Sequence, residues 1–190
     1  MENSKVILLL VVAIVITKIT TFSVDKVRYS YNCETPLHDA LHTRLPNLRR
    51  YGRYIDLIPA ILGVVVLYLY IYEHLDQELI RDGIIFFSMI LIFRTILYSV
   101  TILPSSFCMK GIKNIAFGGC HDCICSGHTI LTLLLAYILY KHNPQYQAAL
   151  MMYCILSSLL IIATRSHYTI DVLISYIVVY AFLKGANASP

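Results

Sequence analysis

Tryptophan is missing from this chain of 190 residues, and charged residues make up only 14% of it. Soluble domains carry roughly 25% charged residues, whereas 58% of this sequence is hydrophobic and its mean hydropathy is +0.69. These figures exclude an ordinary soluble domain and indicate a membrane protein. The formal charge of +4 is modest and nothing resembles a nucleic-acid-binding module, so we expect no nucleic acid among the partners. Without tryptophan, the 15 tyrosines are left to supply the aromatic belts at the membrane interfaces.

The sequence also lacks a polar segment long enough for a second, soluble domain. A membrane-spanning helix needs about 20 apolar residues, and six stretches approach that length. The predicted spans are residues 6–24, 57–72, 83–103, 127–140, 148–164 and 170–183. We therefore expect an all-α integral membrane protein in which residues 1–190 form a single catalytic domain of six transmembrane helices.

The first apolar stretch has a second interpretation. Residues Val6 to Ile16 follow Lys5 and have the length of the hydrophobic region of a signal peptide. No small-x-small cleavage site follows them, which favours a membrane span that is retained.

Two histidine-containing stretches lie where a polar segment meets an apolar one. They are HDCICSGHT at residues 121–129 and RSHYTID at residues 165–171. His167 and Asp171 are four residues apart, so they share one face of a helix. The carboxylate can hold one ring nitrogen of His167 in its N–H form and leave the other free to attack. His128 lies at the end of another predicted span, and the three residues together predict a phosphoryl-transfer site.

Counting membrane crossings predicts that these stretches meet. With six spans, three connections emerge on one membrane face: residues 25–56, 105–126 and 164–169. Both histidine motifs then lie at helix ends on that face. The simpler alternative is that His128 and His167 only cap helix ends at the interface. Asp171 argues against it, because an acid within an apolar run is costly unless it has a partner.

Cysteine usage leaves several alternatives open. Cys120, His121, Cys123, Cys125 and His128 lie within nine residues, and zinc ligands often come as Cys-x-x-Cys followed by histidine. A structural zinc site usually needs two separated pairs, and ligation would remove His128 from acid–base work, so we predict no metal and no cofactor. A disulfide from Cys33 to Cys108 or Cys120 stays open. Cys154 lies in a span and should be an apolar filler.

Four sequence elements resemble those of the sphingomyelin synthase family, a branch of the lipid phosphate phosphatase superfamily. RTILYSVTILP at residues 94–104 looks like the family segment that opens with arginine and closes on Thr-x-Leu-Pro. CHDCICSGHT at 120–129 is similar to Cys-Gly-Asp-x-x-x-Ser-Gly-His-Thr, with His121 in place of the glycine. HYTIDV at 167–172 matches His-Tyr-Thr-x-Asp-Val at each fixed position, and PLHD at 36–39 resembles Pro-Leu-Pro-Asp. Together, in the family's order along the chain and on a six-span profile, the elements are specific.

The resemblance implies a catalytic triad of His128, His167 and Asp171. In that scheme His167 attacks the phosphorus of a glycerophospholipid and displaces diacylglycerol, while His128 protonates the leaving oxygen. The hydroxyl of ceramide then attacks the phospho-histidine. Phosphocholine is the headgroup that best fits the resemblance; ethanolamine or inositol headgroups and diacylglycerol as acceptor stay open. A homo-oligomer also stays open.

Five further residues are candidates for substrate binding. Arg165 is the first candidate to stabilise phosphoryl charge, together with backbone N–H groups that follow Ser126. Arg94, inside a span, is a candidate for binding a lipid phosphate or for partnering a loop carboxylate. Asp122 is a candidate to orient a histidine or to contact a headgroup amine. Asp39 lies either in a substrate loop or at a plain surface.

Two other function classes compete with the transferase. The first is a lipid phosphate phosphatase or phospholipase C-like hydrolase, in which water replaces the acceptor. Its superfamily signature has a first motif rich in lysine and arginine that ends in Arg-Pro, and this sequence has no such motif. The second is a non-enzymatic lipid-binding membrane protein, which the intact triad disfavours.

The charge distribution and the family resemblance predict opposite membrane orientations. Basic residues are concentrated on the expected active face, and the positive-inside rule would put that face in the cytosol. The resemblance implies instead an exoplasmic active site, in the Golgi apparatus or at the plasma membrane. Cations beside a phosphate-handling site have their own reason to be there, so we expect the exoplasmic arrangement.

Overall fold

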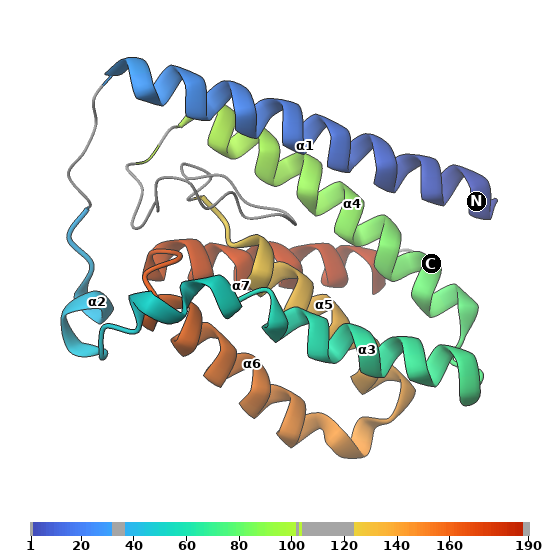
Figure 1. Ribbon diagram of the computed structural model, residues 1–190. Coiled ribbons are helices and arrows are strands. Elements are labelled where there is room, and N and C mark those ends of the chain that lie inside the picture. The colour runs from blue at the N-terminus through green and yellow to red at the C-terminus, as the bar shows by residue number, and fades with distance from the viewer. Residues whose placement is uncertain (1, 32–36, 102, 104–123, 188–190) are drawn as a thin grey trace.

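The computed structural model describes residues 2–31, 37–101, 103 and 124–187, and within these ranges the chain is helical, with no strand. Figure 1 shows the long helices side by side, running alternately in opposite directions. The elements are α1 (Asn3–Tyr31), α2 (Ala40–Arg44), η1 (Arg49–Tyr54), α3 (Leu57–Tyr72), α4 (Gln77–Val100), α5 (Gly127–His142), η2 (Pro144–Tyr146), α6 (Gln147–Ala163) and α7 (Thr169–Asn187). The all-α prediction is confirmed for the described residues.

Each of the six predicted spans coincides with a long helix, and four segments are long and apolar enough to cross a membrane. These four are Asn3–Val24, Arg49–Tyr72, Gln77–Val100 and Pro144–Ala163. Helix α5 has 16 residues, which at 1.5 Å per residue is shorter than a hydrocarbon core of about 30 Å. The structure therefore supports a membrane protein with at least four candidate spans, and the count of six stays a prediction.

Two helix boundaries differ from the prediction for local reasons. Helix α4 begins at Gln77 rather than at 83, because Asp76 caps it by accepting a hydrogen bond from the Glu78 N–H at 2.8 Å. An acid at the cap and another in the first turn complement the helix dipole. Helix α1 continues past the predicted end at 24 to Tyr31, because the polar residues that follow the span are still compatible with helix.

Polar side chains buried between α1 and α4 hold these two helices together. Thr17 Oγ1 lies 2.9 Å from Thr95 Oγ1, and the Tyr98 hydroxyl donates to the Thr17 carbonyl at 2.9 Å. Hydrogen bonds of this kind join helices in lipid, where no water satisfies the groups. Loss of α1 would remove these contacts from Thr95 and Tyr98, which favours a retained first span over a cleaved signal peptide.

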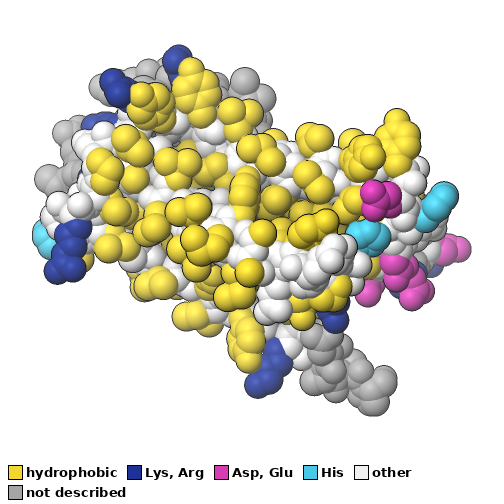
Figure 2. All heavy atoms as spheres, turned by 90° about the horizontal axis from the view of Figure 1, so that it is seen from below, with side chains coloured by type: hydrophobic (Ala, Val, Ile, Leu, Met, Phe, Trp, Pro, Cys, Tyr) yellow, Lys and Arg dark blue, Asp and Glu magenta, His cyan; other side chains and the backbone are white. Residues whose placement is uncertain are grey.

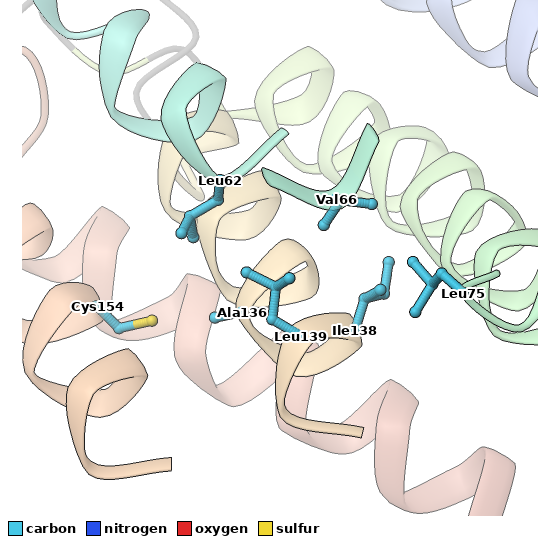
Figure 3. Packing of buried hydrophobic residues seen from close by; sticks show 7 residues of the cluster. All are labelled: Leu62, Val66, Leu75, Ala136, Ile138, Leu139 and Cys154. Atoms are coloured by element: carbon cyan, nitrogen blue, oxygen red, sulfur yellow. The ribbon is translucent and has the colours of Figure 1, made fainter. Parts of the chain in front are cut away.

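Helix α5 lies in the middle of the bundle and contacts α3, α4, α6 and α7. One cluster of buried side chains joins α3, α5 and α6, as Figure 3 shows, and consists of Leu62, Val66, Leu75, Ala136, Ile138, Leu139 and Cys154. Cys154 is a free thiol, 7% exposed, so its prediction as an apolar filler is confirmed. The central position of α5 fixes where its first turn, with His128, can lie.

Candidate active site

The rings of His128 and His167 face one another at one end of the bundle. His128 is the second residue of α5, and His167 precedes α7 by two residues. Their ring centroids are 6.2 Å apart at an interplanar angle of 61°. The two rings come from the start of α5 and the α6–α7 connection, which lie at the same end of the bundle in Figure 1.

Asp171 lies beside His167 and is fully buried. Its Oδ2 is 3.4 Å from His167 Nδ1, and the same oxygen accepts the Tyr168 N–H at 2.9 Å. The His167 side chain is 6% exposed and that of Asp171 1%. A carboxylate at Nδ1 holds that nitrogen as a donor and leaves Nε2 of His167 with its lone pair.

His128 has a carboxylate partner that sequence reasoning missed. Asp56 Oδ1 lies 2.8 Å from His128 Nε2. The Asp56 side chain is 44% exposed and that of His128 14%, so the pair lies at the opening of the site. Asp56 immediately precedes α3, and this position in the sequence could have marked it as a candidate site residue. Like His128 and His167, it is an ionisable residue where a polar segment meets an apolar run on the expected active face.

A sharp turn presents His128 at the start of α5. Ser126 caps the helix by accepting the Thr129 N–H at 3.3 Å. Cys125 before it has a φ of 68°, in the left-handed region, where a non-glycine residue needs support from its surroundings. Arg94 of α4 gives that support, since its Nε donates to the Cys125 carbonyl at 2.6 Å. Arg94 is 1% exposed, and its guanidinium acts here on the backbone of the site.

Ser175 joins the two histidine segments directly. Its hydroxyl lies 3.3 Å from the Ser126 carbonyl and 2.7 Å from the Asp171 carbonyl. The Ser126 N–H also donates to the Asp171 carbonyl at 3.3 Å. These bonds fix the turn before α5 against the first turns of α7, and they set the spacing of the two imidazoles.

Replacing Ser175 by alanine should loosen this junction and destabilise the protein by about 1–2 kcal/mol. Ser88→Ala is the matched control, because Ser88 is equally buried but bonds only the Ile84 carbonyl of its own helix. Thermal unfolding in detergent, followed by circular dichroism, measures both. Equal losses for the two variants would contradict the role of Ser175 as a junction between helices.

The segment from Leu37 to Leu48 is bound onto the turn that carries His167. Asp39 accepts the Thr169 N–H and the Thr169 hydroxyl, each at 2.7 Å. The Asp39 carboxylate also caps α2 through the N–H groups of Leu41 and His42. The His42 ring lies 3.1 Å from the His167 carbonyl through Nε2 and stacks on the Tyr168 ring. This segment therefore positions the backbone of His167.

Arg165 fastens the same segment from the other side. One of its guanidinium nitrogens donates to the carbonyls of His42 and Leu45. The Leu48 N–H donates to the Ala163 carbonyl at 2.9 Å. Arg165 has a φ of 61°, which the bonds around it hold in place.

Acid should weaken the docking of α2. Burial lowers the pKa of His42 below its ordinary 6.5, although its contact with the His167 carbonyl and the charge of Asp39 oppose the shift. The docked segment then binds protons less readily than the undocked one, so the contribution of neutral His42 to docking is fully present above pH 6.5 and decreases as pH falls below it. Burial would raise the pKa of Asp39, but hydrogen bonds from Thr169 and His42 outweigh it and leave that pKa lowered.

Hydrogen exchange of residues 40–44 should therefore speed up between about pH 7.5 and 5.5, after correction for the intrinsic rate. His42→Gln is the informative variant, because an amide can still donate to the His167 carbonyl but does not titrate. We expect this variant to lose most of the pH dependence. An unchanged dependence would show that another group controls docking.

The predicted substrate-binding residues divide into three groups. Arg94, Arg165 and Ser126 lie around the histidines, where their described hydrogen bonds go to the protein backbone. The Asp39 carboxylate is likewise bonded to the protein, because both of its oxygens accept hydrogen bonds from α2 or α7. Asp122 lies outside the described residues. The first three residues and Asp39 thus hold the site together, and their contact with lipid stays a prediction.

Cys125 is the one cysteine of the predicted cluster that lies within the described residues. Burial raises the pKa of its thiol, and its sulfur lies 3.5 Å from the Ser175 hydroxyl. A neutral, buried thiol is a poor zinc ligand. Cys33, Cys108, Cys120, His121 and Cys123 lie outside the described residues, so the zinc and disulfide alternatives are not tested there.

An apolar hollow of about 350 Å³ lies between α5, α6 and α7, toward the end of the bundle away from the histidines. Its lining includes Leu133, Tyr137, Tyr140, Leu150, Met151 and Tyr176. His128, His167, Asp56 and Asp171 do not line it, so the candidate catalytic residues lie outside this hollow.

Comparison with known proteins gives one family match. Residues 119–186 match a family model described as PAP2 superfamily C-terminal. This range contains both histidine motifs and Asp171, and the match supports the lipid phosphate phosphatase superfamily, whose members are phosphatases and phosphotransferases. No curated protein matches the chain. The match supports enzyme chemistry on lipid phosphates in a membrane protein.

Proposed function

We propose that this protein is a lipid phosphotransferase that moves a phospho-headgroup from a glycerophospholipid to ceramide and releases diacylglycerol. Phosphocholine is the first candidate headgroup. The observation that carries the proposal is the pair of imidazoles, His128 and His167, 6.2 Å apart with a carboxylate beside each. The superfamily match over these residues supports the same class of chemistry.

The first step is attack on phosphorus by Nε2 of His167. Asp171 keeps the proton on Nδ1, so the attacking nitrogen has its lone pair. The bond from phosphorus to the diacylglycerol oxygen breaks, and the leaving alkoxide takes a proton from the His128 imidazolium. General acid catalysis of this kind is worth about 10²–10⁴-fold.

The second step reverses the roles. Neutral His128 takes the proton from the primary hydroxyl of ceramide, whose oxygen attacks the phospho-histidine. The phosphorus–nitrogen bond breaks, and both histidines return to their starting protonation states. The enzyme is regenerated without a cofactor.

The start of α5 is the best-placed source of charge stabilisation for the phosphoryl oxygens. Helix N-termini present free N–H groups and a partial positive charge to anions, and His128 lies in this first turn. The turn is held by Ser126 and Arg94. Electrostatic stabilisation of developing charge is usually the largest single contribution to such rates.

A transfer assay with purified protein in vesicles tests the proposal. Ceramide is offered with phosphatidylcholine, phosphatidylethanolamine or phosphatidylinositol in turn, and diacylglycerol replaces ceramide in a parallel series. Chromatography of the lipid products should reveal a phosphosphingolipid and an equal amount of diacylglycerol. Headgroup transfer only to diacylglycerol, offered with acyl chains that differ from those of the donor, would contradict the ceramide assignment.

A hydrolase is the second candidate, because the matched superfamily includes phosphatases. Water would then take the place of the acceptor hydroxyl in the second step, with the same two histidines. Release of the water-soluble phospho-headgroup at the same rate with and without ceramide would favour it. Transfer that depends on ceramide favours the phosphotransferase.

We further propose six spans with the histidine end on the exoplasmic side, in the Golgi apparatus or at the plasma membrane. The alternating helix directions in Figure 1 support one common end for the two histidine motifs. A glycosylation sequon placed between residues 37 and 48 should be modified in the full-length protein. Modification of a sequon at residues 76–80 instead would reverse the orientation.

Asp56 is a positioning residue for His128 in this mechanism. Its Oδ1 accepts from Nε2 of His128, which fixes the ring and leaves Nδ1 as the nitrogen that exchanges a proton with substrate. Replacing Asp56 by asparagine should lower kcat roughly 10- to 100-fold, part of what a whole general acid supplies. The pH profile of kcat/KM should also change.

The matched control for Asp56→Asn is Glu73→Gln. It removes the carboxylate from a histidine–carboxylate pair that lies outside the site. Glu73 Oε2 lies 3.8 Å from His142 Nε2 in the α3–α4 and α5–α6 region. This variant should keep both kcat and the pH profile. Equal effects of the two substitutions would contradict a specific role for Asp56.

A further inference from the structure

Arginine and tyrosine alternate in an exposed segment just before α3. We call residues 49–54, which form η1 with the sequence RRYGRY, the arginine–tyrosine collar. The Arg50 guanidinium carbon lies 4.6 Å from the centroid of the Tyr51 ring, and that of Arg53 lies 4.7 Å from the Tyr54 ring. Neither arginine forms an ion pair with a carboxylate of the described residues. The two stacked guanidinium groups therefore keep donors available for an external anion.

The collar lies directly above a lipid-facing stripe of α3. The exposed apolar side chains follow helical spacing after the collar: Leu57, Ile61, Val64 and Tyr68. Tyr51 and Tyr54 are themselves 42% and 47% exposed. Tyrosine rings beside an apolar stripe mark the level of the lipid headgroups. At that depth the arginines reach the phosphate layer of the membrane.

Charge is distributed unevenly over the two ends of the bundle. The connection from α3 into α4 carries acids at the end away from the histidines: Glu73, Asp76, Glu78 and Asp82. Figure 2 shows an apolar middle and acidic side chains gathered at one end; basic side chains lie at the opposite end and also at other places on this face. The collar belongs to the end with the histidines, so that membrane surface meets positive charge.

We propose that the arginine–tyrosine collar is a binding site for the headgroup of an anionic phospholipid that is not itself consumed. Arg50 and Arg53 donate to phosphate and carboxylate oxygens of the headgroup, and the tyrosine rings hold the guanidinium groups in place. The acyl chains lie along the exposed stripe of α3. This proposal rests on the charge of the collar and not on the orientation proposed above, because anionic phospholipids are concentrated in the cytoplasmic leaflet.

The collar is joined to the active site by a short stretch of backbone. Tyr54 ends η1, Ile55 is buried, and Asp56 follows with its bond to His128. A headgroup bound at the collar would therefore lie within a few residues of Asp56. Binding itself does not depend on the proposed transferase activity, and the test below uses binding alone.

Photolabelling with a lipid analogue tests the site. The full chain is reconstituted in phosphatidylcholine nanodiscs with phosphatidylserine that carries a photoreactive group near its headgroup, and labelled peptides are mapped. We expect label on residues 49–54. Unlabelled phosphatidylserine should reduce the labelling more strongly than the phosphatidylcholine that it replaces, and salt should weaken its advantage.

Arg50→Gln combined with Arg53→Gln should raise the competing mole fraction of phosphatidylserine by roughly fivefold per arginine. The matched control is Lys141→Gln with Lys184→Gln, which removes the same two charges at the other end; Lys141 also lies over a tyrosine ring, that of Tyr137. This control should leave the collar labelling unchanged. Equal competition by the two lipids, label elsewhere only, or no effect of the arginine changes would overturn the proposal.

Discussion

Replacing His167 by glutamine should lower headgroup transfer by roughly 10⁴-fold or more, as is typical when a nucleophile is removed from a catalytic group of residues. The side chain is nearly buried, with Nδ1 held by Asp171, and an amide in its place cannot form the phosphoryl–nitrogen bond. Among the described residues, His167 is the histidine whose ring contacts that of His128. No other described imidazole is therefore placed to form the phosphoryl intermediate in its stead.

His38→Gln is the matched control for this experiment. His38 lies in the segment before α2, near the same end of the bundle, and is exposed. Product formation from radiolabelled phosphatidylcholine, normalised to protein in the membrane, measures both variants. Transfer at near-normal rate by His167→Gln would rule out this residue as the nucleophile.

Replacing Asp171 by asparagine should be almost as damaging, with a loss of about 10³–10⁴-fold in kcat, by analogy with other catalytic carboxylates that orient a histidine. The amide has the same volume and its oxygen can still accept the Tyr168 N–H. It lacks the negative charge that stabilises the His167 ring as phosphorus is attacked, and it can turn an N–H toward Nδ1. The protein should therefore fold and insert normally while transfer fails.

Substrate binding separates this prediction from a folding defect. Asp171→Asn should keep the KM for the donor lipid within a few-fold and the thermal midpoint within a few degrees of wild type. Asp82→Asn, at the exposed start of α4, is the control for removal of a carboxylate. A variant of Asp171 that loses stability and activity together would point to a structural role for this residue.

The sequence predicted the parts of the fold that depend on local pattern. The second predicted span, 57–72, coincides with α3, because an acid at each end, Asp56 and Glu73, bounds a continuous apolar run. Counting membrane crossings predicted that the segments with His128 and His167 would meet, and their rings lie 6.2 Å apart. Spacing of four residues was enough to pair His167 with Asp171, because that contact lies within one turn of chain.

Contacts between distant segments were not predicted. Asp56 and His128 are 72 residues apart, and nothing in the local sequence of either residue indicates the pairing. The polar residues Arg165 and Asp39 were expected to contact lipid because their charge suits phosphate or amine groups. The structure adds that both satisfy backbone groups of α2 and α7, a role that depends on the docking of one segment onto another.

The stereochemical course at phosphorus tests the two-step mechanism most directly. The donor is a phosphatidylcholine analogue with one non-bridging oxygen replaced by sulfur and a single configuration at phosphorus, and ceramide is the acceptor. Transfer through His167 involves two in-line displacements, each with inversion at phosphorus. The two-step mechanism therefore predicts a product that retains the configuration of the donor. A product of inverted configuration would mean direct attack by ceramide, and it would contradict the phospho-histidine on which the proposed function rests.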